Sequence, residues 1–216
     1  MQAENEARPG EAQASSSAQE LVGRIQQALK ADEMEAARRE CDLLAQEPGQ
    51  QAEAEHLLGL VELGVGRYGE ALPRLEAALS LQGDRPDMWA NHGAALAMLG
   101  EAEKAVTSLQ RAVELDPEYE DALLNLGDLL LRTGQREESL RILHRAVQIR
   151  PSARSFALLS QCVHQQGDAE SAETVALAGY NLGPEDQDTR QELIRMLVLL
   201  GRHGEASLLA EGAQNG

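Results

Sequence analysis

The stretch WANHGAALAMLGEAEKA, residues 89–105, decides the fold because its pattern recurs as LLNLGDLLLRTGQREES, residues 123–139, at a spacing of 123 − 89 = 34. Both segments read as Ala- and Leu-rich helices with a glycine in the interior, Gly93 and Gly127. Glycine costs a helix interior roughly 1 kcal/mol relative to alanine. A residue without a Cβ atom also lets a second helix approach closely. The repeated glycine therefore predicts helices that pack in pairs.

The same spacing extends along most of the chain. Counting back from Gly93 gives Gly59, and counting forward the period shortens once to 33 before it returns to 34. Glycines that end one helical segment recur, as do small residues in the next segment and prolines between units. These positions are Gly66, Gly100, Gly134, Gly167 and Gly201; Ala71, Ala105, Ser139, Ala172 and Ala206; and Pro117, Pro151 and Pro184. In the first unit, Asp32 stands where the others have the turn glycine. The glycines predict left-handed helix ends.

A 34-residue period with two helical segments resembles the tetratricopeptide repeat, whose signature residues are matched best at Trp89, Gly93, Ala105 and Pro117. With only 1 Trp, 1 Phe and 3 Tyr in the chain, leucine fills most aromatic positions. The resemblance, to bacterial arrays in particular, implies an all-α, right-handed superhelical solenoid of antiparallel helix pairs. It predicts repeats at 19–51, 52–85, 86–119, 120–152, 153–186 and, in part, 187–213, with a disordered tail at 1–18 and a short tail at 214–216.

The net charge and the cysteine content indicate which partners and which cellular compartment suit this chain. The 216 residues carry 19 Lys and Arg against 36 Asp and Glu, a formal charge of −17, which repels phosphate backbones and argues against nucleic acid. Solubility alone also accounts for such a charge. The sequence shows neither a signal peptide nor an apolar run of membrane-spanning length. Cys41 and Cys162 lie too far apart in a solenoid to pair, so we expect reduced thiols and a cytoplasmic protein.

The sequence offers no catalytic constellation. The five histidines are scattered, none has a partner four residues away, and His92 reads as a packed core residue. No Cys and His cluster has zinc spacing, and every glycine is explained by the repeat rather than by a phosphate loop. We therefore expect no enzyme activity, no metal and no cofactor within these residues.

In the tetratricopeptide family, the first helices of successive repeats line a concave groove, so the resemblance implies a binding site there. It places Asn91 and Asn125 where an amide can donate to and accept from a peptide backbone, although asparagine is also simply common at this position. The remaining groove positions form an apolar floor with acidic rims, which suits a neutral to basic helix or extended segment with apolar anchors. The predicted peptide-binding residues are Leu57, Leu60, Asn91, Ala94, Leu124, Asn125, Asp128, Leu158 and Gln161.

These residues favour a non-catalytic scaffold or adaptor that binds a protein or peptide. The carboxylate clamp of some family members is disfavoured because no lysine flanks Asn91 or Asn125. An alternative is the N-terminal recruitment module of a larger enzyme, since bacterial sulfotransferases, glycosyltransferases and 2-oxoglutarate hydroxylases often carry such arrays. A secretion chaperone fits less well, because the chain is poor in aromatic residues and cysteines.

The C-terminal unit contains LIRMLVLLG, residues 193–201, with five consecutive apolar residues. Terminal repeats need a polar outer face, yet Met196, Leu199 and Leu200 are expected on the side where another repeat would stack. The following segment, residues 204–216, is short and rich in glycine, so it covers that side only in part or acts as a frayed cap. The pattern favours association through this end, with a homodimer as one outcome.

Overall fold

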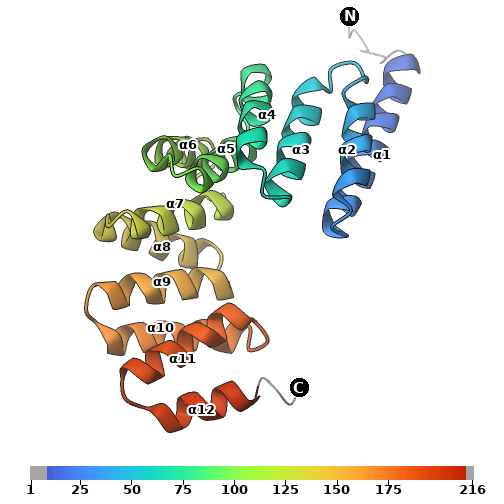
Figure 1. Ribbon diagram of the computed structural model, residues 1–216. Helices are drawn as coiled ribbons and strands as arrows, with labels where there is room; N and C mark the ends of the chain where they lie inside the picture. Colours follow the sequence, from blue (N-terminus) through green and yellow to red (C-terminus); the bar gives the residue numbers. More distant parts are fainter. Residues whose placement is uncertain (1–8, 213–216) are drawn as a thin grey trace, which may run out of the picture. The chain divides into compact units, whose positions relative to one another are not determined.

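A computed structural model describes the backbone of residues 9–212, and within this range every regular element is a helix (Figure 1). The elements are α1 (Pro9–Lys30), α2 (Met34–Leu44), α3 (Gln51–Gly64), α4 (Tyr68–Leu81), α5 (Pro86–Met98), α6 (Ala102–Leu115), α7 (Glu120–Arg132), α8 (Arg136–Ile149), α9 (Ala153–Gln165), α10 (Ala169–Leu182), α11 (Gln187–Leu199) and α12 (His203–Gly212). The expected all-α fold of helix pairs is confirmed. From α3 onward, each pair starts within one residue of an expected repeat boundary.

The chain divides into two compact units, residues 1–108 and 109–216, and α6 runs across the division. In the first unit, α1 to α5 pack in chain order, and the first helices of neighbouring pairs also touch. The second unit repeats this arrangement with α7 to α12. Because repeats contact only their neighbours, each unit has its own apolar clusters, centred on residues such as Ile25 and Leu44 in the first and Leu123 and Leu143 in the second.

The turns between the two helices of a pair adopt the predicted left-handed conformation. The φ angles of the five turn glycines lie between 75° and 93°; these residues are Gly66, Gly100, Gly134, Gly167 and Gly201. Asp32, which replaces this glycine in the first pair, keeps the left-handed conformation with φ 60°. Aspartate is one of the few residues besides glycine that adopt this conformation, so the turn keeps its form in the first pair.

The interior glycines lie where the two helices of a pair meet. A Cβ atom added to Gly59 would be 2.7 Å from Leu75 Cγ, and one added to Gly127 would be 2.7 Å from Leu143 Cγ. Both leucines are fully buried on the second helix of the same pair. This confirms that close helix approach, rather than turn formation, explains these glycines.

Serine hydroxyl groups form hydrogen bonds between the two helices of a pair close to the interior glycine position. In the α7/α8 pair, Ser139 Oγ donates to the carbonyl oxygen of Gly127 at 2.7 Å. In the α9/α10 pair, Ser160 stands at the glycine position and donates to the carbonyl oxygen of Ala172 at 2.8 Å. A serine thus fits on either side of the contact because its hydroxyl finds a main-chain acceptor.

The structure corrects the expected organisation at both ends. The first helix begins at Pro9, so part of the range expected to be a disordered tail is helical, and Ala18 belongs to the core. The stretch EAQASSSAQE, residues 11–20, is rich in good helix formers and extends the helix. At the other end α12 completes a sixth helix pair where only a partial repeat was expected. Residues 1–8 and 213–216 lie outside the described residues.

Candidate peptide-binding groove

A groove of about 690 Å³ lies on the first helices of the second unit, α7, α9 and α11. It is lined by Asp128, Arg154, Ala157, Leu158, Gln161, Gln191, Glu192, Ile194 and Arg195. The ninth residue of each of these three helices is polar, so the repeat places three polar side chains at equivalent sites. These residues are Asp128, Gln161 and Arg195. The apolar residues Leu158 and Ile194 lie among them.

Hydrogen bonds and ion pairs hold the polar groups of this groove in place. Arg154 Nη2 donates to Asn125 Oδ1 at 2.8 Å, which joins α9 to α7. Glu192 is buried on α11, and its Oε1 atom accepts from Arg195 Nη2 at 2.8 Å and lies 3.4 Å from Ser160 Oγ. Since Glu192 is sequestered by these groups, Asp128 is the more accessible carboxylate of the groove, with 37% of its side chain exposed.

The structure brings together three of the predicted peptide-binding residues: Asp128, Leu158 and Gln161 all line the groove. Leu124 does not, since it is 2% exposed and belongs to the core of the second unit. Asn125 is half-buried with its carbonyl oxygen bonded to Arg154, which leaves its amide hydrogens to donate. Ile194 lines the groove but was not predicted, because earlier repeats carry glycine or serine at its position. The large apolar residue at a position that is otherwise small was the signal that could have identified it.

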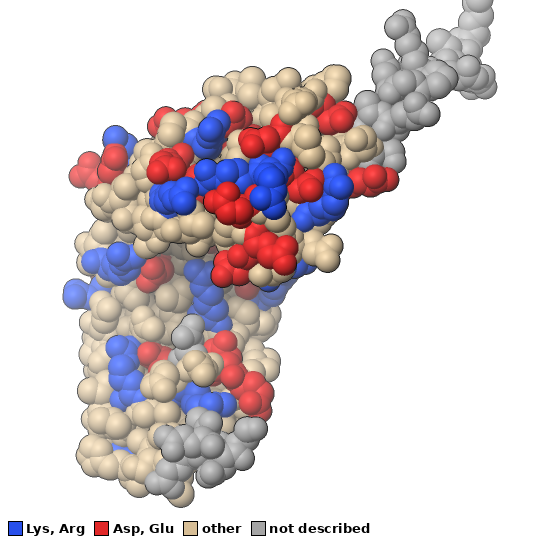
Figure 2. All heavy atoms as spheres, turned by 45° about the vertical axis from the view of Figure 1, so that its right-hand side comes forward, with Lys and Arg blue, Asp and Glu red and all other residues tan. Residues whose placement is uncertain are grey.

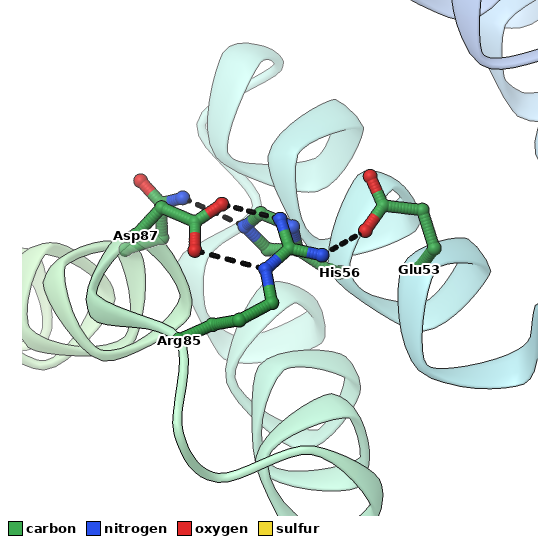
Figure 3. Close-up of polar contacts among 5 residues, drawn as sticks. Glu53, His56, Arg85 and Asp87 are labelled. Carbon is green, nitrogen blue, oxygen red and sulfur yellow. Dashed lines mark hydrogen bonds and ion pairs between the residues drawn. The ribbon is translucent and has the colours of Figure 1, made fainter. Parts of the chain in front are cut away.

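In the first unit, polar side chains on the first helices α3 and α5 and in the loop before α5 form hydrogen bonds with one another (Figure 3). Arg85, in the loop before α5, bonds to Asp87 on one side and to Glu53 of α3 on the other. Asn91 Nδ2 lies 2.9 Å from His56 Nε2, so the amide predicted to hold a peptide is engaged by the neighbouring helix. Leu57 is 3% exposed and packs in the core, which removes another predicted contact. Leu60 and Ala94 are half-buried.

His56 is the most constrained titratable group of this cluster. It is 3% exposed, and its Nδ1 atom has no hydrogen-bond partner among the described residues. Burial lowers the pKa of His56, with Asp87 and Glu53 acting in the opposite direction and Arg85 in the same direction. The ring is therefore held in its neutral form at neutral pH.

Charged side chains of the first unit are matched in pairs: Arg24 with Glu40, Arg38 with Glu62 and Arg74 with Glu55. In Figure 2, basic and acidic side chains accordingly lie next to one another over the upper part of the molecule. Within the described residues, no group of three His, Cys, Asp or Glu side chains could hold a metal ion. No helix in that range is both long and apolar enough to cross a bilayer.

The two cysteines are free and buried, as the sequence predicts. Burial, reinforced by Asp42, Glu40 and Glu53, raises the pKa of the Cys41 thiol to about 12. Burial also raises the pKa of Cys162. Both groups are therefore protonated and unreactive at neutral pH.

Of the three residues predicted to form a self-association surface, Met196 is not on the surface. Met196 is fully buried in a cluster with Ala172, Leu193 and Ala206, because α12 covers this side of α11. Leu199 is 52% exposed and Leu200 is half-buried.

Stacked helix pairs with left-handed turns and a groove on the first helices define an all-α helical repeat protein, the architecture of a protein-interaction scaffold. Tetratricopeptide repeat models match residues 56–120 and 96–162. We therefore identify the chain as a tetratricopeptide repeat array. A search of curated proteins gave no match.

Solved structures, two of them described as tetratricopeptide repeat proteins, resemble the chain over most of its length. MamA from Desulfovibrio magneticus RS-1, residue 41 to the end, is 26% identical with a TM-score of 0.65, covering 77% of this chain and 94% of that chain. TTC0263, a thermophilic protein from Thermus thermophilus, is 19% identical with a TM-score of 0.72, covering 84% of this chain and 99% of that chain. YrrB, described as having an unusual peptide-binding site, is 23% identical with a TM-score of 0.60, covering 76% of this chain and 86% of that chain. These likenesses agree on the fold.

Proposed function

We infer that this protein is a non-catalytic scaffold that binds a segment of a partner protein in the groove of the second unit. The observation that carries the proposal is the groove itself, in which three successive first helices place apolar side chains beside hydrogen-bonding groups. A recognition groove for a peptide needs both kinds of group, since apolar pockets hold anchors and polar groups fix the backbone.

The chemistry of the lining indicates the partner segment. Leu158 and Ile194 accept an apolar anchor, while Gln161 and Gln191 can donate to and accept from peptide groups. Asp128, which also pairs with Arg132 at 3.7 Å, is the carboxylate that a lysine or arginine of the ligand reaches, while Arg154 and Arg195 balance the acidic charge of the lining. We therefore propose a largely neutral segment with one or two basic residues, bound within a reducing compartment such as the cytoplasm, where free thiols persist.

The groove, rather than Asn91, is the centre of the proposed site. Asn91 already interacts with His56, so a ligand there would have to displace an internal hydrogen bond. Asn125 lies beside the groove, where Arg154 orients its amide. Binding to the second unit alone therefore leaves the His56 and Arg85 cluster intact.

The test is selection of random peptides on the immobilised full chain, followed by titration of the recovered sequences by calorimetry. Gln161→Ala should weaken binding by roughly 1 kcal/mol, about fivefold, through loss of hydrogen bonds, and Leu158→Glu should remove binding by placing a charge among apolar contacts. Asn91→Ala is the matched control and should leave affinity unchanged. Selection of Lys- or Arg-containing peptides would support the charge assignment. Recovered peptides that bind Leu158→Glu as tightly as the wild-type chain would place the site elsewhere.

A further inference from the structure

A second recess lies outside the proposed peptide groove, between α10, α11 and α12. Its volume is about 470 Å³. The apolar residues that line it are Leu177, Tyr180, Leu193, Leu197, Leu208 and Leu209. None of them lines the groove of the proposed site.

Two of these leucines depart from the repeat pattern. Leu177 is the ninth residue of α10, and the ninth residues of α4, α6 and α8 are the polar Glu76, Gln110 and His144. Leu208 is the sixth residue of α12, where α6, α8 and α10 carry Thr107, Arg141 and Thr174. Repeat packing does not require an apolar side chain at either position. Leu177 is nevertheless 44% exposed and Leu208 is 71% exposed, so their apolar surface is available for contact with another molecule.

Charged groups of both signs stand at the edge of the recess. Arg202 forms ion pairs with Glu173 of α10 and with Glu205 of α12, the latter at 2.6 Å. Leu208 projects from the same surface that contains the recess. One surface therefore carries a projecting apolar side chain, a cavity lined by leucines, and both a guanidinium and carboxylates.

We propose that this surface, defined by Leu177, Leu208 and the Arg202 ion pairs, is a two-fold interface with a second copy of this chain. A two-fold interface must be complementary to itself, because the same residues meet on both partners. Here Leu208 of each copy enters the recess of the other, and Arg202 of each copy faces the carboxylates of the other. A surface with only a projection or only a recess, or with one sign of charge, would not meet this requirement.

The charge of the chain determines how this association responds to salt. Each copy carries a formal charge of −17, so two copies repel one another over long distances. Salt screens that repulsion, while apolar contacts in the recess persist. Dimerisation therefore strengthens as salt rises from low to physiological concentration, the opposite of an interface held mainly by ion pairs.

Sedimentation velocity and light scattering on the full chain test the proposal. Between about 1 and about 100 µM protein, the mass should rise from 23.3 kDa toward twice that value. Leu208→Glu and Leu177→Glu should each weaken dimerisation more than tenfold, and the conservative change Leu208→Met should retain it. Circular dichroism should show unchanged helicity for each variant, because both side chains are already exposed.

The matched control is Leu81→Glu, which places the same charge on a 60% exposed leucine of the first unit. It should dimerise as the wild-type chain does. Leu199→Glu changes an exposed leucine of α11 that does not line the recess, and it should also dimerise. A chain that stays monomeric throughout, or a dimer that is lost with Leu199→Glu and kept with Leu208→Glu, would overturn the proposal. Neither result bears on peptide binding to the groove.

Discussion

Leu143 of α8 occupies the space that a side chain on Gly127 of α7 would need, with Leu143 Cγ 2.7 Å from the site of the missing Cβ atom. Leu143 is fully buried, so a side chain at position 127 would push it against its neighbours in the core. The glycine is therefore required by the contact between two helices of one repeat. The same relationship joins Gly59 to Leu75 in the first unit.

Gly127→Ala should destabilise the second unit by about 1–3 kcal/mol, because overpacking a well-filled contact outweighs the gain in helix propensity. Urea denaturation followed by circular dichroism measures this change. The control is Gly69→Ala on α4, where nothing lies within 4 Å of an added Cβ atom. That variant should be neutral or more stable by less than about 1 kcal/mol. Equal effects of the two substitutions would contradict the steric role of Gly127.

Asp32→Gly should stabilise the first unit. Residue 32 has φ 60°, a conformation that costs most residues with a side chain roughly 1–2 kcal/mol, costs aspartate less and costs glycine little. Part of the gain is lost because glycine is more flexible in the unfolded chain, so we expect a net stabilisation of about 1 kcal/mol or less. The midpoint of thermal unfolding reports the change. Gly134→Ala, at φ 82°, should shift it in the opposite direction.

Acid should weaken the first unit through His56 and His92. Burial lowers the pKa of both imidazoles in the folded chain, with Glu76 opposing the effect at His92. The unfolded chain then binds protons more readily than the folded chain, so stability is complete above the unfolded pKa of about 6.5 and falls as pH drops below it. Carboxylates stay largely ionised between pH values of about 5.5 and 7.5, so histidine protonation dominates in this window.

The measurement is the urea midpoint as a function of pH across that window. The double change of His56→Gln with His92→Gln should flatten the profile. His203→Gln, which removes an exposed histidine of α12 and leaves His56 and His92 in place, should keep the wild-type slope. A slope that survives the double change would remove these two residues as its source.

Cys41 should resist alkylation in the folded chain. Its side chain is fully buried and its pKa is raised to about 12, so the reactive thiolate is scarce at neutral pH. Iodoacetamide labelling followed by mass spectrometry should show modification of Cys41 only at the rate at which the first unit opens. Modification in urea, where the thiol is exposed, provides the reference rate. Rapid labelling without denaturant would show that α2 opens locally.

Part of the candidate groove was predictable because the repeat assigns equivalent positions to each helix. Asp128 and Gln161 are separated by one period, and both line the groove as expected. Leu57 and Leu124 were misplaced because the family pattern identifies the groove face of a helix but not how deeply a neighbouring pair covers it. Ile194 was missed because a position that usually carries a small packing residue lines the groove here.

The sequence by itself determined that helices pair, where the pairs turn and at which small residues the two helices approach. These features depend on contacts between residues close in the chain, and each contact leaves a residue type at a fixed spacing, as Gly59, Gly93 and Gly127 do. Only the tertiary structure decided which apolar residues remain exposed. Met196 is buried because α12 folds over it, while Leu208 on that same helix is exposed. The exposure of a side chain depends on the combined coverage by several helices, and no single spacing in the sequence records that coverage.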